Sequence, residues 1–293
     1  RQIDALLKSL WDERLKATQA TLVAVGGYGR GALFPFSDVD LLILIPNAIN
    51  KKEESVIASF VSLLWDIGLD VGHSVRKLKE CVNEAEKDIT TQTNLMESRF
   101  LVGSKSLFTQ FKNQVVDRID KHRFCDAKLV ELRQRHSRYN DSSQNLEPNL
   151  KESPGGLRDL QTILWIAQAA GFGSTWARLR ENGVITKTEQ AQLEKHERAL
   201  SLVRTLLHLK AGRKEDRLLF DFQRLLAADL GFRTTKAKPE TEQLMQVVFK
   251  ASQSVSLLSS IVLQHLTELI HGTSNADPII IDADFQIRNS FLE

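Results

Sequence analysis

The sequence predicts an α+β fold in two parts, a first part that mixes strands with helices and a second part that is all helical. Short apolar runs near the amino terminus, bounded by polar or glycine-containing segments, indicate buried strands. After Val102, apolar residues recur at spacings of three and four, which is typical of helices packed on one face. We therefore expect a first domain over residues 1–103 and a helical domain over residues 104–293.

Three strands are expected in the first domain. Thr21–Val25 is apolar and ends at glycines, and Asp38–Ile45 contains five consecutive apolar residues, which indicates a strand buried on both faces. Ser55–Ile67 has the apolar period of a helix, and Leu69–Val75 follows as a shorter, more polar strand. The expected order is helix, strand, short helix, strand, helix, strand.

In the second domain the helical pattern is clearest in four segments. A polar segment with two prolines, Asn140–Pro154, divides this domain, and Ile279–Ile281 returns to strand-like character. The four helical segments are Leu157–Ala170, Glu189–Leu209, Leu218–Leu230 and Glu240–Ile270.

The four tryptophans of the chain follow apolar faces of expected helices, and we expect them to lie in the core. They are Trp11, Trp65, Trp165 and Trp176.

The composition is that of an ordinary globular protein, with 42% hydrophobic and 26% charged residues. A net charge of +2 is too small to indicate nucleic-acid binding, and no apolar run reaches the ~18 residues of a membrane span. Two cysteines cannot form a disulfide framework and indicate reduced thiols, so we expect a cytoplasmic protein. Because the chain starts at Arg1 without methionine, we expect a longer parent protein.

Gly26 and Gly27 lie between an expected strand and a short helix. Backbone without a Cβ atom can approach a phosphate closely, and the first amides of a helix are free to donate to it. Tight strand-to-helix turns also use glycine, so the pair is a weak signal alone. Arg30 follows closely and is a candidate contact for the β- or γ-phosphate, with a solvated helix position as the alternative.

Asp38 and Asp40 are two residues apart, so in a strand both carboxylates leave the same face. Two crowded carboxylates are unfavourable unless a cation joins them, and carboxylates with substrate phosphates are the usual ligands of Mg²⁺. The alternative is that Ser37 and Asp38 cap a turn while Asp40 is solvated. It does not explain an aspartate beside five apolar residues. Ser37 is a candidate phosphate contact as well as a turn residue.

Asp70 is the candidate third carboxylate. Leu69 and Val71 flank it, which indicates a strand in which Asp70, Gly72 and Ser74 share one face. The alternative is an aspartate at a strand end that faces water. His73, between two valines in alternation, is interpreted as a packed histidine.

These residues resemble the nucleotidyltransferases of the DNA polymerase β superfamily, which implies a polymerase β-like domain with a small mixed sheet. A longer string resembles the bacterial PII uridylyltransferase family more narrowly: Val25-Gly-Gly-Tyr-Gly-Arg-Gly-Ala-Leu-Phe-Pro-Phe-Ser-Asp-Val-Asp-Leu-Leu-Ile-Leu44. Related enzymes, including glutamine synthetase adenylyltransferase, share this string. The stretches 69–76, 145–151, 153–159 and 216–221 make the combination specific.

The resemblance implies transfer of UMP from UTP to a tyrosine of the signal protein PII. It assigns Gly26 and Gly27 to the triphosphate, Asp38 and Asp40 to two Mg²⁺ ions, and Asp70 to the metal and the attacking hydroxyl. It also implies a following HD-type hydrolase domain that removes UMP and ACT domains that sense glutamine. The dipeptide His-Asp does not occur in the sequence, so we expect the hydrolase centre to lie outside it, and no segment shows the pattern of the ACT domains.

Lys151 and Arg158 are the candidate nucleotide contacts in the helical domain. Ser153 and Pro154 suit the start of a helix, and the glycines that follow suggest a close backbone approach to nucleotide or catalytic domain. Asp159 would orient one of the basic residues, and a helix start that serves domain packing is the alternative.

A basic cluster further along the chain is interpreted as a solvated helix end. Its members are His208, Lys210, Arg213 and Lys214. Two other functions stay open at this point. One is a protein adenylyltransferase of the same fold, and the other is a degenerate nucleotidyltransferase kept as a regulatory binding module.

Overall fold

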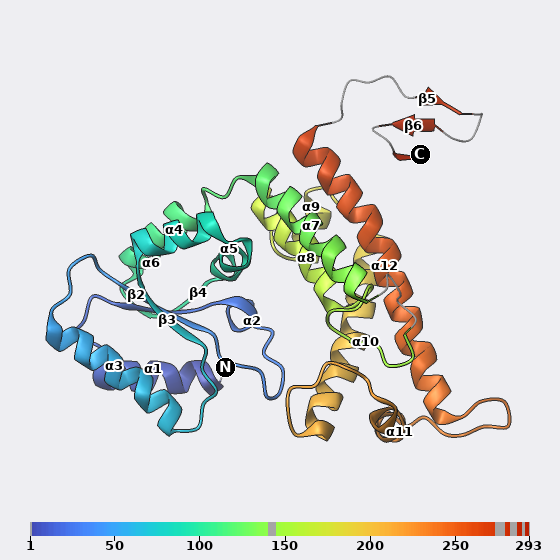
Figure 1. Ribbon diagram of the computed structural model, residues 1–293, viewed down its shortest axis with the longest axis horizontal. Helices are drawn as coiled ribbons and strands as arrows, with labels where there is room; N and C mark the ends of the chain where they lie inside the picture. Colours follow the sequence, from blue (N-terminus) through green and yellow to red (C-terminus); the bar gives the residue numbers. More distant parts are fainter. Residues whose placement is uncertain (1, 140–144, 273–278, 282–285, 289–290, 293) are drawn as a thin grey trace. The chain divides into compact units, whose positions relative to one another are not determined.

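A computed structural model describes residues 2–139, 145–272, 279–281, 286–288 and 291–292 (Figure 1). The chain forms two compact units. The first unit contains Arg1–Ile119 and Ser201–Leu244, and the second contains Asp120–Leu200 and Met245–Glu293. These units are defined by spatial contact, and the domain boundary placed at residues 103 and 104 from the sequence stays a prediction.

A four-stranded mixed sheet lies at the centre of the first unit. Its strands are β1 (Thr21–Ala24), β2 (Leu41–Ile45), β3 (His73–Lys77) and β4 (Arg99–Gly103), in the order β3-β2-β1-β4. β1 is antiparallel to β2 and β4, and β2 is parallel to β3. The predicted small mixed sheet is confirmed, although β4 was missed among the helical patterns that begin near it.

Helices cover both faces of this sheet, as Figure 1 shows. One face carries α1 (Gln2–Arg14) and α3 (Lys51–Asp66), which pack on the odd-numbered residues of β2. The other face carries α4 (Leu78–Lys87), α5 (Ile89–Met96), α6 (Lys105–Phe111) and the π-helical turn η1 (Lys112–Val116). The continuous apolar run of β2 is therefore explained by burial on both faces.

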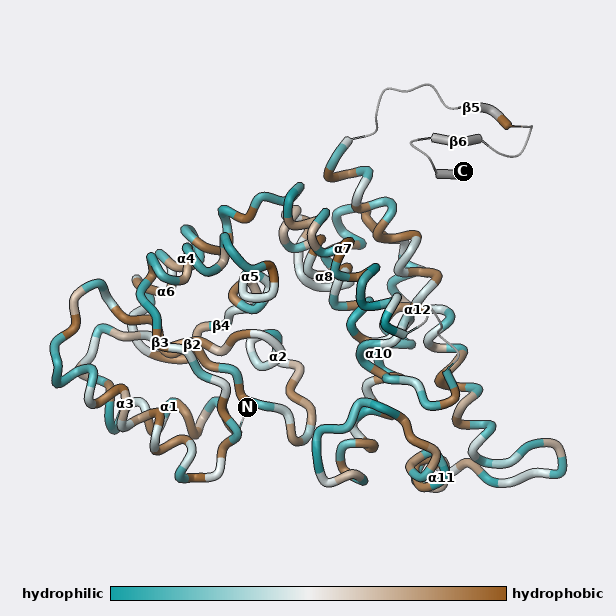
Figure 2. Tube along the Cα trace, viewed as in Figure 1, coloured by the Kyte–Doolittle hydropathy of each residue, from teal (hydrophilic) through white to brown (hydrophobic). Residues whose placement is uncertain are grey.

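The alternation of residue types along these helices follows from this arrangement. In Figure 2, α1, α3 and α4 alternate hydrophobic and hydrophilic residues, as expected of helices that cover a sheet with one side. Trp11 of α1 meets Phe60 of α3 edge to face, with ring centroids 5.5 Å apart. The first unit also contains the short helix α2 (Gly26–Gly29), the last turns of α10 (Lys187–Ala211) and α11 (Phe220–Asp229).

In its described residues the second unit is helical apart from three short strands at its carboxyl end. It contains α7 (Lys121–Arg138), α8 (Leu157–Ala169), α9 (Trp176–Glu181), most of α10 and nearly all of α12 (Glu240–His271). The strands are β5 (Ile279–Ile280), β6 (Gln286–Arg288) and β7 (Phe291–Leu292). The helical periods read from the sequence are confirmed for α8, α10, α11 and α12.

By length and composition α12 is the one described helix that could cross a membrane. Only part of its most apolar window, 44%, is buried. The core helix of a globular protein meets the same criterion, and α12 carries fully buried residues such as Val255 and Leu266 on its inner face. This packing covers the inner face only, since Leu257 and Ile261 on the same helix are exposed.

Two strands begin later than the sequence suggested. β2 starts at Leu41 and not at Asp38, and β3 covers His73–Lys77 and not Leu69–Val75. The segments before the two strands still form a backbone hydrogen bond, from the Val39 amide to the Asp70 carbonyl, but β1 ends at Ala24 and the chain turns away at Gly26. Hydrophobic pattern does not show where a neighbouring strand stops.

Two aromatic side chains also differ from their expected positions. Trp65 is 53% exposed near the end of α3, whereas the other three tryptophans are buried as predicted. His73 is exposed as well and meets the Trp65 ring edge to face, with centroids 5.2 Å apart. His73 lies on β3, which has a neighbouring strand on one side only, and Trp65 of α3 lies beside this edge of the sheet.

Asp4 ties α1 to the glycine turn and to β4. Its carboxylate accepts from the Tyr28 hydroxyl at 2.6 Å and from the Arg99 guanidinium at 2.6 and 3.2 Å. Burial raises the pKa of Tyr28, so its hydroxyl stays protonated and donates. The Arg99 hydrogen bonds lower the pKa of Asp4 from 3.8 to about 2, against the opposing effect of partial burial.

We predict that Asp4→Asn lowers the free energy of unfolding by about 1 kcal/mol at neutral pH, as expected for a partly exposed charged hydrogen-bond network. Because the folded-state pKa of Asp4 is depressed, its contribution is present above pH 4 and is lost as the pH falls towards 2. Urea denaturation from pH 6 to pH 2.5 should show the two proteins converging. A difference that is constant with pH would contradict the assignment.

Candidate active site

The glycine turn and the expected acidic residues meet at one end of the sheet. The Val25 amide donates to the Asp40 carbonyl at 3.1 Å, and the Val39 amide donates to the Asp70 carbonyl at 2.8 Å. The turn after β1, the segment before β2 and the segment before β3 therefore lie side by side. Sequence positions 25, 40 and 70 are brought together by backbone pairing.

Asp38 and Asp40 share one face of their segment. Val39, between them, is 3% exposed and packs into the core that α1 and α3 cover, so the flanking aspartates face the opposite side. The parallel register of β2 and β3 pairs Leu41 with His73, and continuing it places Asp70 opposite Asp38. The Asp70 side chain is exposed at this edge.

The Asp40 carboxylate lies between two glycines. A Cβ atom at Gly72 would lie 2.6 Å from Asp40 Oδ1, and one at Gly26 would lie 3.3 Å from Oδ2. Gly26 has a φ of 56°, a left-handed conformation that favours glycine, and its Cβ would also lie 2.4 Å from Asn94 Oδ1. These glycines leave room for an acid and an amide of the protein itself.

Two residues near this turn were not found from the sequence. Asn94 lies on α5 in a run of polar residues, where nothing distinguishes it from a solvated position. Gly29 is required by packing, because a Cβ atom there would lie 1.8 Å from the Glu97 carbonyl. By contrast, a Cβ atom at Gly27 would find its nearest neighbours at 3.6 and 3.8 Å, so protein packing does not require that glycine.

Arg30 and Ser37 have protein partners in this structure. The Arg30 guanidinium forms an ion pair with Glu97, whose side chain is largely buried. The Ser37 amide donates to the Phe34 carbonyl at 3.1 Å and closes a turn. Phe36, within this turn, is 52% exposed and has a φ of 58°. A left-handed conformation is uncommon for an aromatic residue and marks the turn before Asp38 as strained.

The basic cluster at the end of α10 matches the predicted solvated helix end in Lys210, Arg213 and Lys214, whose side chains are exposed, but not in His208. His208 is fully buried, with Nδ1 2.7 Å from the Pro35 carbonyl and Nε2 3.1 Å from Asp216. Arg204 bonds the same Asp216 oxygen at 2.6 Å and lies over the Phe34 ring, 4.0 Å from its centroid. The sequence pattern failed for His208 because the Pro35 carbonyl that it contacts is 173 residues away along the chain.

Lys214 belongs to the same segment and reaches the acidic pair. Its Nζ atom lies 3.4 Å from Asp38 Oδ2, and both side chains are about half exposed. The segment before β2 therefore has two neighbours, the segment before β3 on one side and the segment after α10 on another.

A divalent cation fits the acids that are present. Among residues 2–139 and the other described parts of the chain, no group of three or more His, Cys, Asp or Glu could hold a metal ion by itself. The two carboxylates of Asp38 and Asp40 share a face, and Mg²⁺ commonly binds one or two carboxylates while phosphates and water complete its coordination. Gly26 and Gly72 leave space for the Asp40 carboxylate, and we call this pair the glycine cradle. The arrangement suits a site in which the protein supplies only part of the metal coordination.

Lys151 and Arg158 lie in the second unit and have acidic or amide partners there. Lys151 Nζ is 3.5 Å from Glu152, and Arg158 bonds Glu152 at 3.1 Å and Gln161 at 2.9 Å. Arg158 also lies over the Trp165 ring. Both basic residues therefore have a carboxylate partner, Glu152, within their own unit.

The glycines near Arg158 serve packing against α12. A Cβ atom at Gly155 would lie 2.0 Å from the Ser252 carbonyl, so the expected close backbone approach is to a helix of the same unit. Gly156 caps α8, and Ser153, expected as the cap, instead accepts from the Asn149 amide at 3.0 Å. Buried Asp159 bonds Arg135 at 2.6 Å and His136 at 2.9 Å, and it does not orient Arg158.

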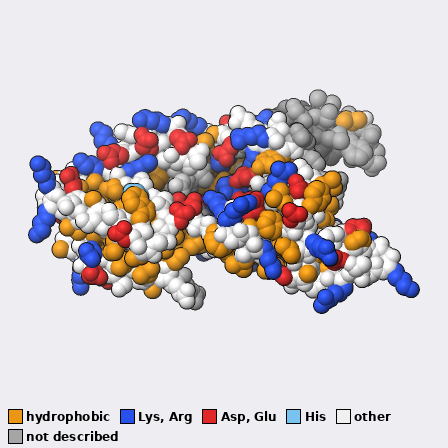
Figure 3. All heavy atoms as spheres, turned by 60° about the horizontal axis from the view of Figure 1, so that its bottom comes forward, with side chains coloured by type: hydrophobic (Ala, Val, Ile, Leu, Met, Phe, Trp, Pro, Cys, Tyr) orange, Lys and Arg blue, Asp and Glu red, His pale blue; other side chains and the backbone are white. Residues whose placement is uncertain are grey.

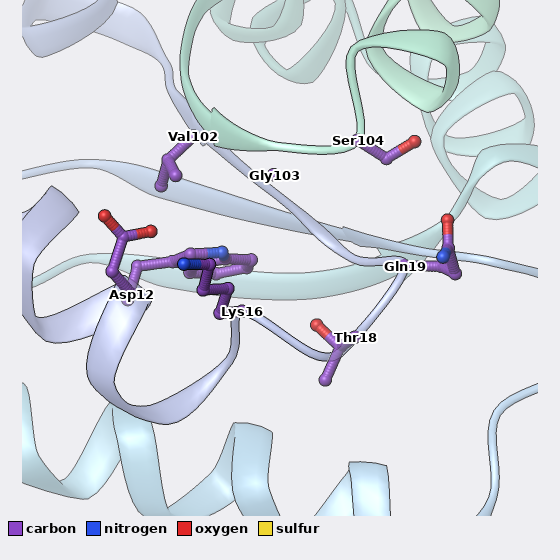
Figure 4. A pocket seen from close by; sticks show the side chains of 8 residues that line it. Asp12, Lys16, Thr18, Gln19, Val102, Gly103 and Ser104 are labelled. Carbon is purple, nitrogen blue, oxygen red and sulfur yellow. The ribbon is translucent and has the colours of Figure 1, made fainter.

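A hollow of about 330 Å³ lies at the other end of the sheet (Figure 4). Asp12 of α1 and Lys16, which follows this helix, line it on one side, and Gly103 and Ser104 border it where β4 ends. It adjoins the start of β1, whereas the acidic segment lies beyond the end of β1. None of the residues predicted for the site lines it.

Two family models match the chain. The nucleotidyltransferase domain model matches residues 3–94, which include the glycine turn and all three acids, and the GlnD PII-uridylyltransferase model matches residues 123–263. The chain belongs to the PII-uridylyltransferase family of nucleotidyltransferases. Nucleotidyltransferases generally use divalent metal ions, in agreement with the donor set at Asp38 and Asp40.

Curated relatives in this family are similar over the whole chain. The bifunctional uridylyltransferase/uridylyl-removing enzyme of Burkholderia orbicola (strain AU 1054) is 46% identical over 292 residues, which is 99% of this chain and 34% of the relative. The enzyme of the same name from Burkholderia thailandensis is 45% identical over 295 residues, 100% of this chain and 34% of the relative. The chain thus spans about a third of the length of these relatives.

We predict that Gly72→Ala weakens Mn²⁺ binding by roughly tenfold, because the added Cβ displaces the Asp40 carboxylate. The melting temperature should change by no more than a few degrees, since Gly72 is exposed and its neighbour is a side-chain end. Calorimetric titration with MnCl₂ measures the affinity. Ser74→Ala on the same strand face is the matched control, and equal affinities for wild type and Gly72→Ala would contradict the role of the cradle.

Proposed function

We propose that this chain transfers UMP from UTP to a tyrosine of the signal protein PII and releases pyrophosphate, in the cytoplasm. The observation that carries this proposal is the Asp40 carboxylate seated between Gly26 and Gly72, with Asp38 on the same face. The names of the relatives support the choice of uridylyl group, and the nucleotidyltransferase model covers this site.

In the proposed mechanism Gly26 and Gly27 contact the triphosphate of UTP, and Asp38 and Asp40 bind Mg²⁺. Bound Mg²⁺ offsets the charge on the attacking and leaving oxygens of an in-line displacement at the α-phosphorus. The tyrosine hydroxyl has a pKa near 10 and needs assistance to attack at neutral pH. Asp70, which lies opposite Asp38 when the register of β2 and β3 is continued, would hold that hydroxyl and accept its proton.

Three of the other four predicted contacts would require an exchange of partners. Arg30 would leave Glu97 to reach the β- or γ-phosphate, and Ser37 would use its hydroxyl while its amide keeps the turn. Lys151 and Arg158 share Glu152, and nucleotide phosphate would have to replace that carboxylate. We therefore rank the three aspartates above these four residues.

Other activities are proposed to lie elsewhere in a longer protein. The relatives are named as uridylyl-removing enzymes too, and the chain spans 34% of their length. We propose that hydrolysis and glutamine sensing belong to further domains and that this chain alone does not release UMP. No nucleic-acid or membrane partner is proposed, and acidic and basic side chains are interspersed on the face that Figure 3 shows.

We predict that Asp38→Ala and Asp40→Ala each abolish UMP transfer, because each removes one of two proposed metal ligands. Radiolabelled UTP and purified PII measure the transfer, and ATP in place of UTP tests for an adenylyltransferase. Asp12→Ala is the control, since this exposed acid lines the hollow at the far end of the sheet. Substantial transfer by either site variant would overturn the metal assignment.

We predict a different result for Asp70→Asn, which keeps size and removes charge. UTP affinity should stay within about threefold, while the transfer rate falls by at least ~100-fold, as for a lost acid–base contact. Calorimetric titration with UTP and steady-state transfer to PII give the two quantities. Equal losses of binding and rate would make Asp70 a binding or folding residue, and no change would place the third carboxylate elsewhere.

A further inference from the structure

A lysine from the segment after α10 is paired with one of the two proposed metal ligands. Lys214 Nζ lies 3.4 Å from Asp38 Oδ2, with 46% of the lysine side chain and 45% of the aspartate side chain exposed. An exposed pair of this kind contributes little to stability. Because the pair lies next to Asp40 and the glycine turn, it affects the binding of metal and phosphate at this site.

The backbone around Lys214 is held in place on both sides. Before it, the buried His208 ring contacts the Pro35 carbonyl at 2.7 Å. After it, Asp216 contacts His208 at 3.1 Å and Arg204 at 2.6 Å. Since Pro35 is three residues from Asp38, these contacts fix the lysine backbone against the turn that leads into the acidic pair. The lysine side chain itself is exposed and has a flexible four-carbon stem.

Neighbouring basic residues have other partners. Lys210 Nζ is 2.9 Å from Asp229, and Arg213 is 2.9 Å from Glu215. Lys214 is thus the member of this cluster whose ammonium group meets the acidic pair. A divalent cation on Asp38 would compete with that ammonium group for the same carboxylate oxygens. Once displaced, the ammonium group would lie beside the negatively charged triphosphate that accompanies the metal.

We infer that Lys214 is a phosphate-binding residue of this site, which neutralises Asp38 in the absence of nucleotide and binds the triphosphate when metal occupies Asp38. This inference rests on the proposed function, and it deepens it by naming a contact from residues that the nucleotidyltransferase model, 3–94, does not include. Removal of the lysine should therefore leave the affinity for metal alone unchanged or higher, and it should lower the affinity for triphosphate.

The test uses Lys214→Gln with two calorimetric titrations and without PII. Binding of MnCl₂ alone should be unchanged or tighter, because a competitor for Asp38 is gone. Binding of Mg²⁺–tripolyphosphate should weaken by roughly tenfold, the effect of losing one charged hydrogen bond. Lys210→Gln is the matched control, because it removes the same charge from the same helix end and should keep wild-type affinity for both.

Lys214→Arg should retain most of the tripolyphosphate affinity, and the melting temperature of Lys214→Gln should match wild type because the side chain is exposed. Unchanged tripolyphosphate affinity in Lys214→Gln, an equal loss in Lys210→Gln, or no binding by wild type would overturn the inference. The probe contains no uracil and no acceptor protein. A failure of UMP transfer to PII would therefore leave the result on Lys214 standing.

Discussion

The close fit of one carboxylate between two glycines sets the arrangement of this site. Asp40 can face the same side as Leu42 and Leu44 only if the neighbouring backbone leaves space, and Gly26 and Gly72 provide it from either side. Glycine 26 also takes the left-handed conformation that turns β1 into α2. A side chain at either position would move the acid, so the glycines of the turn are required before any nucleotide is considered.

The segment from α10 to α11 adds a second constraint from far along the chain. Asp216 holds Arg204 and His208, and these hold Phe34 and Pro35 at the start of the strained turn before Asp38. A left-handed Phe36 costs free energy of the order of 1 kcal/mol or more and persists where surrounding contacts determine it. The buried histidine and arginine supply such contacts, so the position of Asp38 depends on residues more than 160 positions later.

Much of the fold and the acidic pair could be predicted from the sequence, because both are local patterns. Five apolar residues in succession gave β2, and a two-residue spacing gave the shared face of Asp38 and Asp40. Predictions failed where a distant partner decides the outcome. The buried His208 contacts Pro35, and Gly155 lies against Ser252 of α12. The length of β3 follows that of β2, with which it pairs. The local pattern of a single sequence does not show which residues far apart in the chain will be in contact.

The division into two units changes what counts as the catalytic part of the chain. A domain cut at residue 103 contains the sheet, the glycine turn and all three acids, and the nucleotidyltransferase model ends at residue 94. It lacks the segment Ser201–Leu244, which is compact with the sheet and covers the turn through His208. Without this segment the Pro35 carbonyl and the Phe34 ring lose their buried partners, and Asp38 loses its ammonium group. The acidic pair is therefore encoded early in the sequence, but its surroundings are completed only by α10 and the residues that follow it.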